Sequence, residues 1–261
     1  MQRLAVEQRR LLGPRAQWHV GDIAWGRWQH EGREHEWELR QWDDRAWSWL
    51  RLDRGTLDCD VHRDHWELLD EILDEPRART AYAFEDDAKT RSVLARHGFS
   101  APGEPLHFYA RDLAERPELP PLPEGFRERT VEEADLAERV AVHRDVWAPS
   151  RVTESSYANV RAAWPYRTSL DCIIEAPDGR FAAYALLWPD DANGVGELEP
   201  VGVRSEFRRR GLGAAVCLAA LARWHDEGGR KAIVYCMTDS ACALYESIGF
   251  LRHATLVAYA R

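Results

Sequence analysis

The stretch that decides the fold spans residues 197–214 and reads ELEPVGVRSEFRRRGLGA. Apolar residues from Gly196 to Val203 predict a strand, and a basic turn with two glycines follows directly. From Leu212 to Trp224 small and apolar residues predict a buried helix, ended by Gly228-Gly229. Such a junction can bind an anion, because the first amides of a helix have no intrahelical partner and carry partial positive charge.

The residues of this turn distinguish between three kinds of phosphate-binding loop. A P-loop requires a Gly-Lys pair, which the chain lacks. A dinucleotide fingerprint requires three spaced glycines, and only Gly211 and Gly213 are available. RRRGLG, at 208–213, resembles the (Q/R)xxGx(G/A) loop of the GCN5-related N-acetyltransferases, the GNAT family. Taken alone, the loop also fits an exposed basic turn before a core helix.

Two further segments strengthen this resemblance. LYESIGF, at 244–250, matches the Tyr-x-x-x-Gly-Phe sequence that the family places after the loop, and Val201-Gly202-Val203 resembles its fourth strand. The resemblance covers roughly residues 126 to 261. It implies the acyl-CoA N-acyltransferase (GNAT) fold, an α/β fold with a mixed sheet and helices on its faces.

The order of elements in this part agrees with that fold class. Strands are expected at 126–131, 170–175, 181–188, 196–203, 232–236 and 251–260. Helices are expected at 132–147, 154–163, 212–224 and 240–248, the second capped by Thr153. Asp178-Gly179 predicts a hairpin turn.

The clearest domain boundary is the segment 117–125, PELPPLPEG. Its four prolines exclude a helix or a central strand, so we expect a stiff linker. This linker would separate an N-terminal domain, residues 1–116, from a C-terminal catalytic domain, residues 126–261.

The N-terminal part repeats the end of the C-terminal part in diverged form. LARHGF at 94–99 aligns with YESIGF at 245–250, and Tyr-Ala-Arg recurs at 109–111 and 259–261. Two matches that are separated by nearly the same number of residues indicate a duplication. We therefore predict two tandem GNAT copies, a layout similar to that of mycothiol synthase, although this likeness does not transfer a substrate.

The first copy lacks the features of a cofactor site. Strands at 36–42, 46–52 and 56–62 and a helix at 66–73 are expected. DHWE, at 64–67, replaces the glycine turn, and Leu94 stands where the second copy has Tyr245. We expect a degenerate copy that binds no acetyl-CoA, packs on the active copy and closes its substrate cleft.

The resemblance implies acetyl-CoA as co-substrate and no metal. Acetyl-CoA would insert between the strands at 196–203 and 232–236, its pantetheine arm pairing with the backbone as an added strand would. Thr238 stands where asparagine is usual, and Ser205 where proline is common. The expected cofactor-binding residues are Val201, Gly202, Val203, Arg208, Arg209, Arg210, Gly211, Leu212, Gly213, Ala214, Thr238 and Tyr245.

Three catalytic roles follow from the resemblance and from chemistry. Tyr245 matches the family's general acid, although an aromatic anchor between helix and sheet is the alternative. Glu197 and Glu199 share one face of a strand, so either is a candidate base; the alternative is a solvent-facing pair or a salt bridge, and Pro200 weakens the parity argument. The amide of Val203 would face the thioester oxygen.

The acceptor is less defined than the cofactor. We expect its pocket to be lined from among six aromatic and charged residues, although each is also compatible with ordinary packing. These residues are Arg151, Glu154, Tyr157, Trp164, Tyr166 and Trp188.

Composition excludes several classes of partner. A net charge of −9 argues against nucleic acid, and no apolar run is long enough to cross a membrane. The five scattered cysteines form no metal motif and are expected to be free thiols. Without a secretory signal, a cytoplasmic location is expected. Composition leaves monomer and homodimer undecided.

The combined interpretation is an acetyltransferase that moves an acetyl group from acetyl-CoA to a primary amine of a small metabolite or antibiotic by direct attack. Two alternatives stay open. One is an acyl-CoA-binding sensor or scaffold without turnover, and the other is a protein or peptide N-acetyltransferase.

Overall fold

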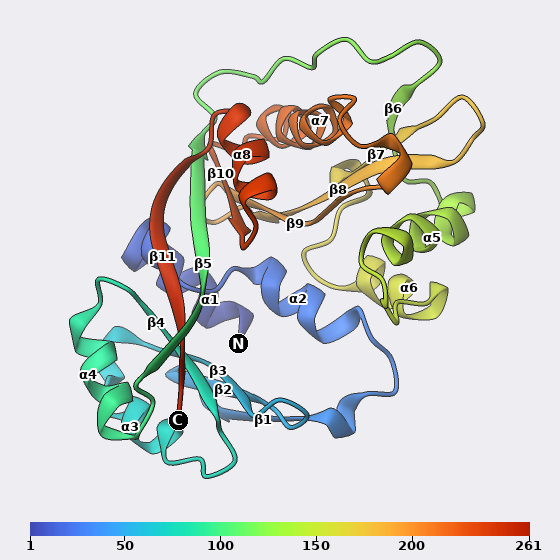
Figure 1. Ribbon diagram of the computed structural model, residues 1–261. Coiled ribbons are helices and arrows are strands. Elements are labelled where there is room, and N and C mark those ends of the chain that lie inside the picture. Colours follow the sequence, from blue (N-terminus) through green and yellow to red (C-terminus); the bar gives the residue numbers. More distant parts are fainter.

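Eleven strands form one continuous mixed sheet in the computed structural model, which describes all 261 residues (Figure 1). The strand order is β1-β2-β3-β4-β11-β5-β10-β9-β8-β7-β6. The strands are β1 (Trp37–Trp42), β2 (Ala46–Arg51), β3 (Thr56–Val61), β4 (Thr80–Phe84), β5 (Ala101–Asp112), β6 (Arg127–Thr130), β7 (Asp171–Glu175), β8 (Phe181–Asp190), β9 (Val195–Val203), β10 (Lys231–Cys236) and β11 (Leu251–Ala260).

Eight α-helices cover this sheet. They are α1 (Gln2–Leu12), α2 (Val20–Trp28), α3 (Leu68–Leu73), α4 (Ala88–Arg96), α5 (Leu136–Val146), α6 (Glu154–Ala162), α7 (Leu212–Asp226) and α8 (Asp239–Ser247). No helix combines the length and apolar character that crossing a bilayer requires.

The C-terminal half places helices on both faces of strands β6 to β10. Helix α7 packs on β7, β8 and β9 from one side, while α2 and α5 pack on β8 and β9 from the other. All ten residues of β8 are buried because both faces are covered. The elements predicted for this half are confirmed to within a few residues, including the Thr153 cap, whose side chain accepts from the amide of Ser156.

The final strand of each half lies in the sheet of the other half. Strand β5 pairs antiparallel with β10, and β11 pairs antiparallel with β4. The two exchanged strands also pair with each other, forming the long ribbon that joins the halves in Figure 1. The Tyr-Ala-Arg repeats lie at the ends of these two strands, so the tandem arrangement is confirmed. The division into residues 1–116 and 126–261 stays a prediction, since the sheet continues across it.

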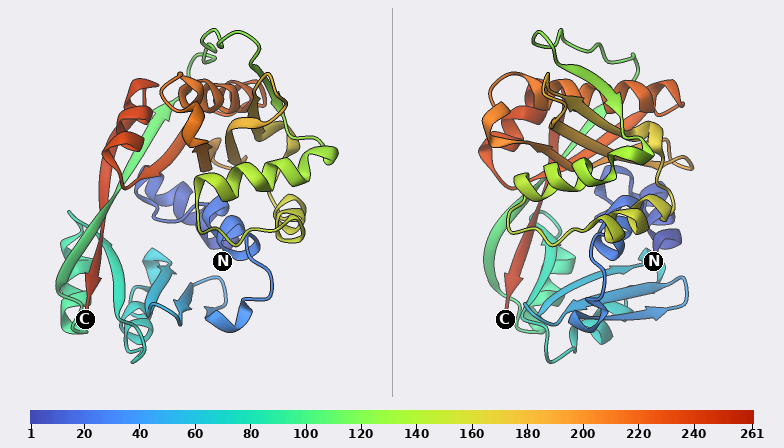
Figure 2. Two further views of the ribbon diagram at one scale, coloured as in Figure 1. Left: turned by 45° about the vertical axis from the view of Figure 1, so that its right-hand side comes forward. Right: turned by 90° about the vertical axis from the view of Figure 1, so that its right-hand side faces the viewer.

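Helices α1 and α2 are absent from the sequence-based prediction. They lie between the two halves (Figures 1 and 2), and α2 contacts α6, β8 and β9 of the C-terminal half. A Cβ atom on Gly21 of α2 would come within 2.6 Å of the Trp188 side chain. The glycine therefore allows α2 to approach β8 closely, which brings N-terminal residues to the C-terminal half.

Candidate active site

Strands β9 and β10 diverge where the cofactor is expected. They pair in parallel only from Lys231 to Ile233, opposite Val195 to Glu197. Beyond Glu197 no pairing with β10 continues, so a wedge opens between the two strands. The structure thus shows the splayed strands that the family resemblance implies.

A bulge in β9 controls which residues face this wedge. Leu198 pairs with Leu187 and Val201 with Ala185, so β9 carries one extra residue, at Glu199-Pro200. Proline donates no ladder hydrogen bond, which favours such an irregularity. The bulge reverses the strand's alternation: Glu197 faces His19 at the end of the α1–α2 connection, while Val201 and Val203 pack on the α7 core.

The backbone of β9 after the bulge is directed into the wedge. Arg204 donates its amide to Ala182, which makes Val203 and Ala183 a non-hydrogen-bonded pair. The N–H groups of Val201 and Val203 therefore point away from β8, toward the gap beside β10. An extended ligand could add to this edge as a strand would. The Val203 carbonyl is partly engaged, because Arg208 Nε donates to it over 3.3 Å.

The loop before α7 presents a row of free amides. Gly211 caps the helix with φ +78°, and no side chain accepts from the first turn. None of the six backbone N–H groups from Arg209 to Ala214 donates a hydrogen bond within the protein. The amide of Arg208 differs, since it donates to the Ser205 carbonyl. Six unpaired donors at a helix N-terminus, with the exposed Arg208, Arg209 and Arg210 beside them, are suited to a diphosphate.

Tyr245 lies on α8 and is only 6% exposed. Its ring packs edge-on against Phe250, so the anchoring role is visible in the structure. Its hydroxyl forms no hydrogen bond within the protein, and burial holds the pKa of Tyr245 well above its ordinary value of 10.0. The phenol therefore stays protonated at neutral pH, as a general acid must.

Glu197 is sealed inside a polar network. Its side chain is 0% exposed, and its Oε2 lies 3.1 Å from Nδ1 of His19. That nitrogen accepts from the amide of Gly21, and Nε2 faces the Val195 carbonyl, so His19 carries its proton on Nε2. Burial lowers the pKa of His19 to about 4, so the ring is neutral.

The two carboxyl groups beside this neutral ring, Glu197 and Asp22, are both shifted toward their protonated forms. Burial raises the pKa of Glu197 to about 8, and burial also raises the pKa of Asp22, which accepts from the His19 amide over 2.7 Å. The contact between Glu197 and His19 therefore joins neutral groups and is not an ion pair, and neither Glu197 oxygen has a hydrogen-bond partner within the protein. Glu197 is a buried carboxylic acid with no path to an acceptor.

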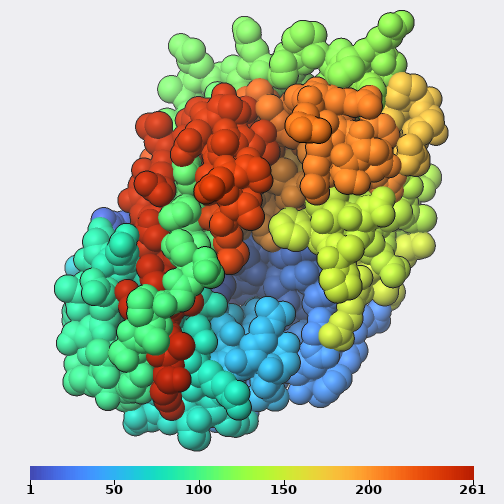
Figure 3. Space-filling model, viewed as in Figure 1, coloured from blue at the N-terminus to red at the C-terminus, as the bar shows by residue number.

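Glu199 borders an open cavity of about 490 Å³ between the two halves. Figure 3 shows a hollow between the blue N-terminal segments and the yellow-green segment that follows α5. Burial, with Asp22 nearby, raises the pKa of Glu199 to about 8. The other lining residues are mostly polar: Trp25, Gln29, His30, Arg33, Asp53, Arg54, His143, Trp147, Pro149, Ser150, Arg151 and Pro200.

Five of the six residues expected to line the acceptor pocket lie elsewhere, and only Arg151 borders this cavity. Tyr157 and Tyr166 donate to Asp171, which is buried beside the Arg139 guanidinium. Trp188 is buried and donates to the Glu199 carbonyl. Glu154 is exposed at the start of α6, and Trp164 borders a separate hollow.

The cavity instead draws half its wall from the N-terminal half. Trp25, Gln29, His30 and Arg33 come from α2 and the segment after it, and Arg54 comes from the turn between β2 and β3. No motif marks these residues. The one local signal is the capping box of His19 and Asp22. It predicts where α2 starts in the sequence but not where the helix packs in the fold.

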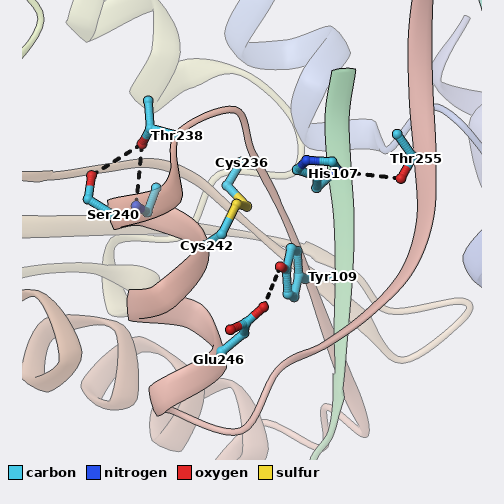
Figure 4. The surroundings of a disulfide bond; sticks show 9 residues. His107, Tyr109, Cys236, Thr238, Ser240, Cys242, Glu246 and Thr255 are labelled. Carbon is cyan, nitrogen blue, oxygen red and sulfur yellow. Dashed lines mark hydrogen bonds between the residues drawn. A yellow bond between two sulfur atoms is a disulfide. The ribbon is translucent and has the colours of Figure 1, made fainter. Parts of the chain in front are cut away.

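The start of α8 differs from the prediction in two ways (Figure 4). Cys236 and Cys242 form a disulfide, so the expectation of five free thiols is wrong for this pair, whose Cα atoms lie 5.6 Å apart in the folded chain. Cys59, Cys172 and Cys217 are free. Thr238 caps α8, its hydroxyl accepting from the Ala241 amide over 3.3 Å, so the position of the family's asparagine here serves the helix.

Comparisons with known proteins agree with this geometry. Residues 138–250 match the acetyltransferase (GNAT) family. A mycothiol acetyltransferase of Rhodococcus jostii is 32% identical over 212 residues, covering 74% of this chain and 68% of that protein. One of Actinosynnema mirum is 29% identical over 200 residues, covering 74% and 67%.

Solved structures share the fold along the whole chain. A tandem GNAT protein from the clavulanic acid biosynthesis pathway has a TM-score of 0.70 at 15% identity, covering 100% of this chain and 93% of that one. A GCN5-related N-acetyltransferase from Sphaerobacter thermophilus has a TM-score of 0.68 at 18% identity, covering 100% and 90%.

Proposed function

Because the chain belongs to the GNAT family of acetyltransferases, we propose that it transfers the acetyl group of acetyl-CoA to a primary amine of a small polar molecule. The proposal depends mainly on one observation, that the candidate cofactor site adjoins the cavity between the halves. The six free amides before α7 and the wedge beside β9 lead to Glu199, where the cavity between the halves begins.

The wedge and the loop before α7 offer a contact to each part of acetyl-CoA: the diphosphate, the pantetheine arm and the thioester. The amides of Arg209 to Ala214 would hold the diphosphate, and the inward-facing backbone of Val201 and Val203 would pair with the pantetheine arm. The Val203 amide would then donate to the thioester oxygen, on which charge develops during attack. Gly213 keeps the approach open, because a Cβ atom there would lie 3.3 Å from both Val203 and Leu244.

Glu199 and Tyr245 would move the protons of the reaction. Glu199 takes a proton from the acceptor's ammonium, and the neutral amine attacks the thioester carbon. Tyr245 gives its proton to the departing sulfur, and the attacking nitrogen loses its second proton to the resulting tyrosinate, directly or through water, so that the products are an amide and a thiol. Glu197 takes no direct part, since it is sealed from the cavity and already protonated.

The cavity favours a small polar acceptor over a peptide. Trp25 and Trp147 offer aromatic faces, and arginine and carboxylate side chains surround them. The cavity adjoins a second hollow of about 350 Å³ formed only by the N-terminal half, which shares His30, Arg33 and Arg54 with it. Relatives named mycothiol acetyltransferase put the amine precursor of mycothiol first among the acceptors to test.

The experiment measures thiol release from acetyl-CoA with a panel of amines: the mycothiol precursor, amino sugars, aminoglycosides, amino acids and lysine peptides. We expect turnover with one small amine and none with peptides. Tight coenzyme A binding without turnover on any amine would instead indicate a sensor, and activity on peptides alone would indicate a protein acetyltransferase.

A further inference from the structure

A covalent bond holds α8 at the edge of the cofactor wedge. Cys236 is the last residue of β10, and Cys242 lies in the first half of α8 (Figure 4). Between them, residues 237–240 are all exposed. The disulfide therefore closes a short surface loop that connects the strand beside the wedge to the helix that carries Tyr245.

The other attachments of α8 lie near its C-terminal end. Tyr109 donates to Glu246 over 2.7 Å, and Arg111 donates to the Ile248 carbonyl over 2.7 Å. At its N-terminal end the helix has its own Thr238 cap and the partly buried side chains of Ala241 and Leu244. The bond from Cys242 is thus the main tie between the first turns of α8 and β10.

Tyr245 depends on this tie because it follows Cys242 by three residues and so lies on the same side of the helix, one turn further on. Its hydroxyl has no hydrogen bond within the protein that would hold the side chain in place independently. A small rotation or shift of α8 would therefore displace the phenol from the position where it meets the departing sulfur, and displacements of this kind strongly slow a proton transfer.

We propose that the Cys236–Cys242 disulfide is an exchange site for small thiols, and that opening it loosens α8 and displaces Tyr245. This inference rests on the proposed function, which itself releases a small thiol, coenzyme A, beside α8. Disulfides with an accessible sulfur are the ones that exchange readily with small thiols.

The exchange is chemically balanced with thiols alone. Cys242 is half-buried and Cys236 is buried, so the sulfur of Cys242 is the one open to attack. A thiolate forms a new bond to this sulfur, the original disulfide breaks, and the Cys236 thiolate leaves and takes a proton from water. A second thiol then attacks the mixed disulfide, giving a small-molecule disulfide and the Cys242 thiol.

The test first establishes the bond and then its effect. Peptide mapping by mass spectrometry, without reductant, should find Cys236 joined to Cys242, and incubation with coenzyme A should give a coenzyme A adduct on Cys242. Hydrogen exchange of the amides at 238–245 should become faster when a phosphine reduces the full-length enzyme. Cys59→Ser, which removes a free cysteine of β3, is the matched control and should change none of these readings.

Kinetics then separate a positioning role from a merely structural one. Reduction, or the Cys236→Ser/Cys242→Ser pair, should lower kcat about tenfold while leaving the KM for acetyl-CoA nearly unchanged. In a Tyr245→Phe background, reduction should lower kcat no further, because the group it displaces is already absent.

Three results would overturn the inference. The first is free thiols at both positions, and the second is an unchanged kcat after proven reduction. The third is a fall in kcat on reduction of the Tyr245→Phe variant that equals the fall in the wild type. Reduction of the wild-type enzyme serves where the double serine variant fails to fold. Should no amine be acetylated in either redox state, the proposed function fails, and the exchange site is still judged by the adduct and by hydrogen exchange.

Discussion

Two glutamates separated by one residue have different chemistry in this protein because their surroundings differ. Glu197 is fully buried beside a neutral His19 at the start of α2, whereas Glu199 borders the cavity between the halves. Burial raises the pKa of both to about 8. The same raised pKa therefore gives an inert acid at Glu197 and a candidate base at Glu199. The difference is that only Glu199 has access to the cavity.

Glu199→Gln should lower kcat/KM about a hundredfold and remove its dependence on pH. A pKa raised to about 8 means that the carboxylate, the form that accepts a proton, appears as pH rises through that value. Wild-type kcat/KM should accordingly rise with pH, reach roughly half its maximum at about pH 8 and level off above about pH 9. A pH profile of the variant that keeps the same rising limb would show that another group is the base.

Glu197→Gln should stabilise the protein near neutral pH. Because the folded pKa of about 8 exceeds the ordinary value of 4.5, the stability that the protonated acid contributes is complete below pH 4.5 and is lost as pH rises toward 8. A glutamine amide has nearly the same shape as the protonated acid but cannot ionise. We expect the melting temperature at pH 7 to rise by about 3 °C.

Thermal melts from pH 5 to pH 8 would check this, with the exposed Glu154→Gln as control. A Glu197→Gln variant that melts lower than wild type throughout the range would contradict the assignment of a protonated acid.

The residues of the proposed cofactor loop could be identified from the sequence because a single local segment contains them all. Arg208 to Ala214 need only a strand, a glycine and a helix in sequence order, and local geometry then leaves their amides unpaired. Cavity residues such as Arg33 and Arg54 were not predictable, since long-range packing alone brings them to Glu199.

At the scale of elements, the turn from β9 into α7 acts through its backbone conformation. Gly211 adopts φ +78°, and an added Cβ atom would meet nothing within 4 Å. Arg204 fixes the start of the turn by pairing with Glu138 and Asp145 of α5, at 3.0 and 2.9 Å. These ion pairs therefore fix the start of the loop, while the amides of residues 209–214 stay unpaired.

Gly211→Asp should abolish coenzyme A binding by placing a carboxylate against the diphosphate. Gly179→Asp, in the hairpin between β7 and β8, is a matched control, because Gly179 also has a positive φ, +84°, and open space around it. Both variants should lose about 1 kcal/mol of stability from the left-handed conformation. Calorimetric titration should find binding lost in the first and retained in the second, and equal affinity in both folded variants would refute the loop assignment.

Most elements were predictable from local patterns, whereas α1 and α2 were missed. The strands of the C-terminal half show apolar runs and turn signals, and Pro200 indicated the irregularity that became the β9 bulge. The segment that forms α2 contains Gly21 and Gly26, which weaken a helical pattern. Its helical state depends on packing against β8 and β9, which no local window contains.

At the scale of the whole molecule, β5 and β11 join two GNAT halves by exchanging places. Both strands end in Tyr-Ala-Arg and follow similar helices, so local pattern cannot decide which sheet each one enters. The sequence therefore predicted the duplication but not the exchange. As a result the C-terminal half gains β5 next to β10, and the N-terminal half gains β11 next to β4.

Cutting the chain within residues 117–125 should leave a stable, active complex of two fragments. This linker forms no helix or strand, whereas β5 remains paired with β10 and β11 with β4 after the cut. A protease site inserted there allows the cut, and uncleaved protein treated with the same protease is the control. The fragments should co-elute in gel filtration and retain acetyl transfer.

Each fragment alone should fail to fold. Residues 126–261 by themselves would expose the edge of β10 that β5 covers and would lose α2 from the face of β8 and β9, leaving a long unpaired edge beside bare apolar surface. Circular dichroism and gel filtration of this fragment should show aggregation or an unfolded chain, and mixing with residues 1–116 during refolding should restore the complex. A monomeric, folded fragment 126–261 that binds coenzyme A would show that the exchanged strand is dispensable and that the halves are independent domains.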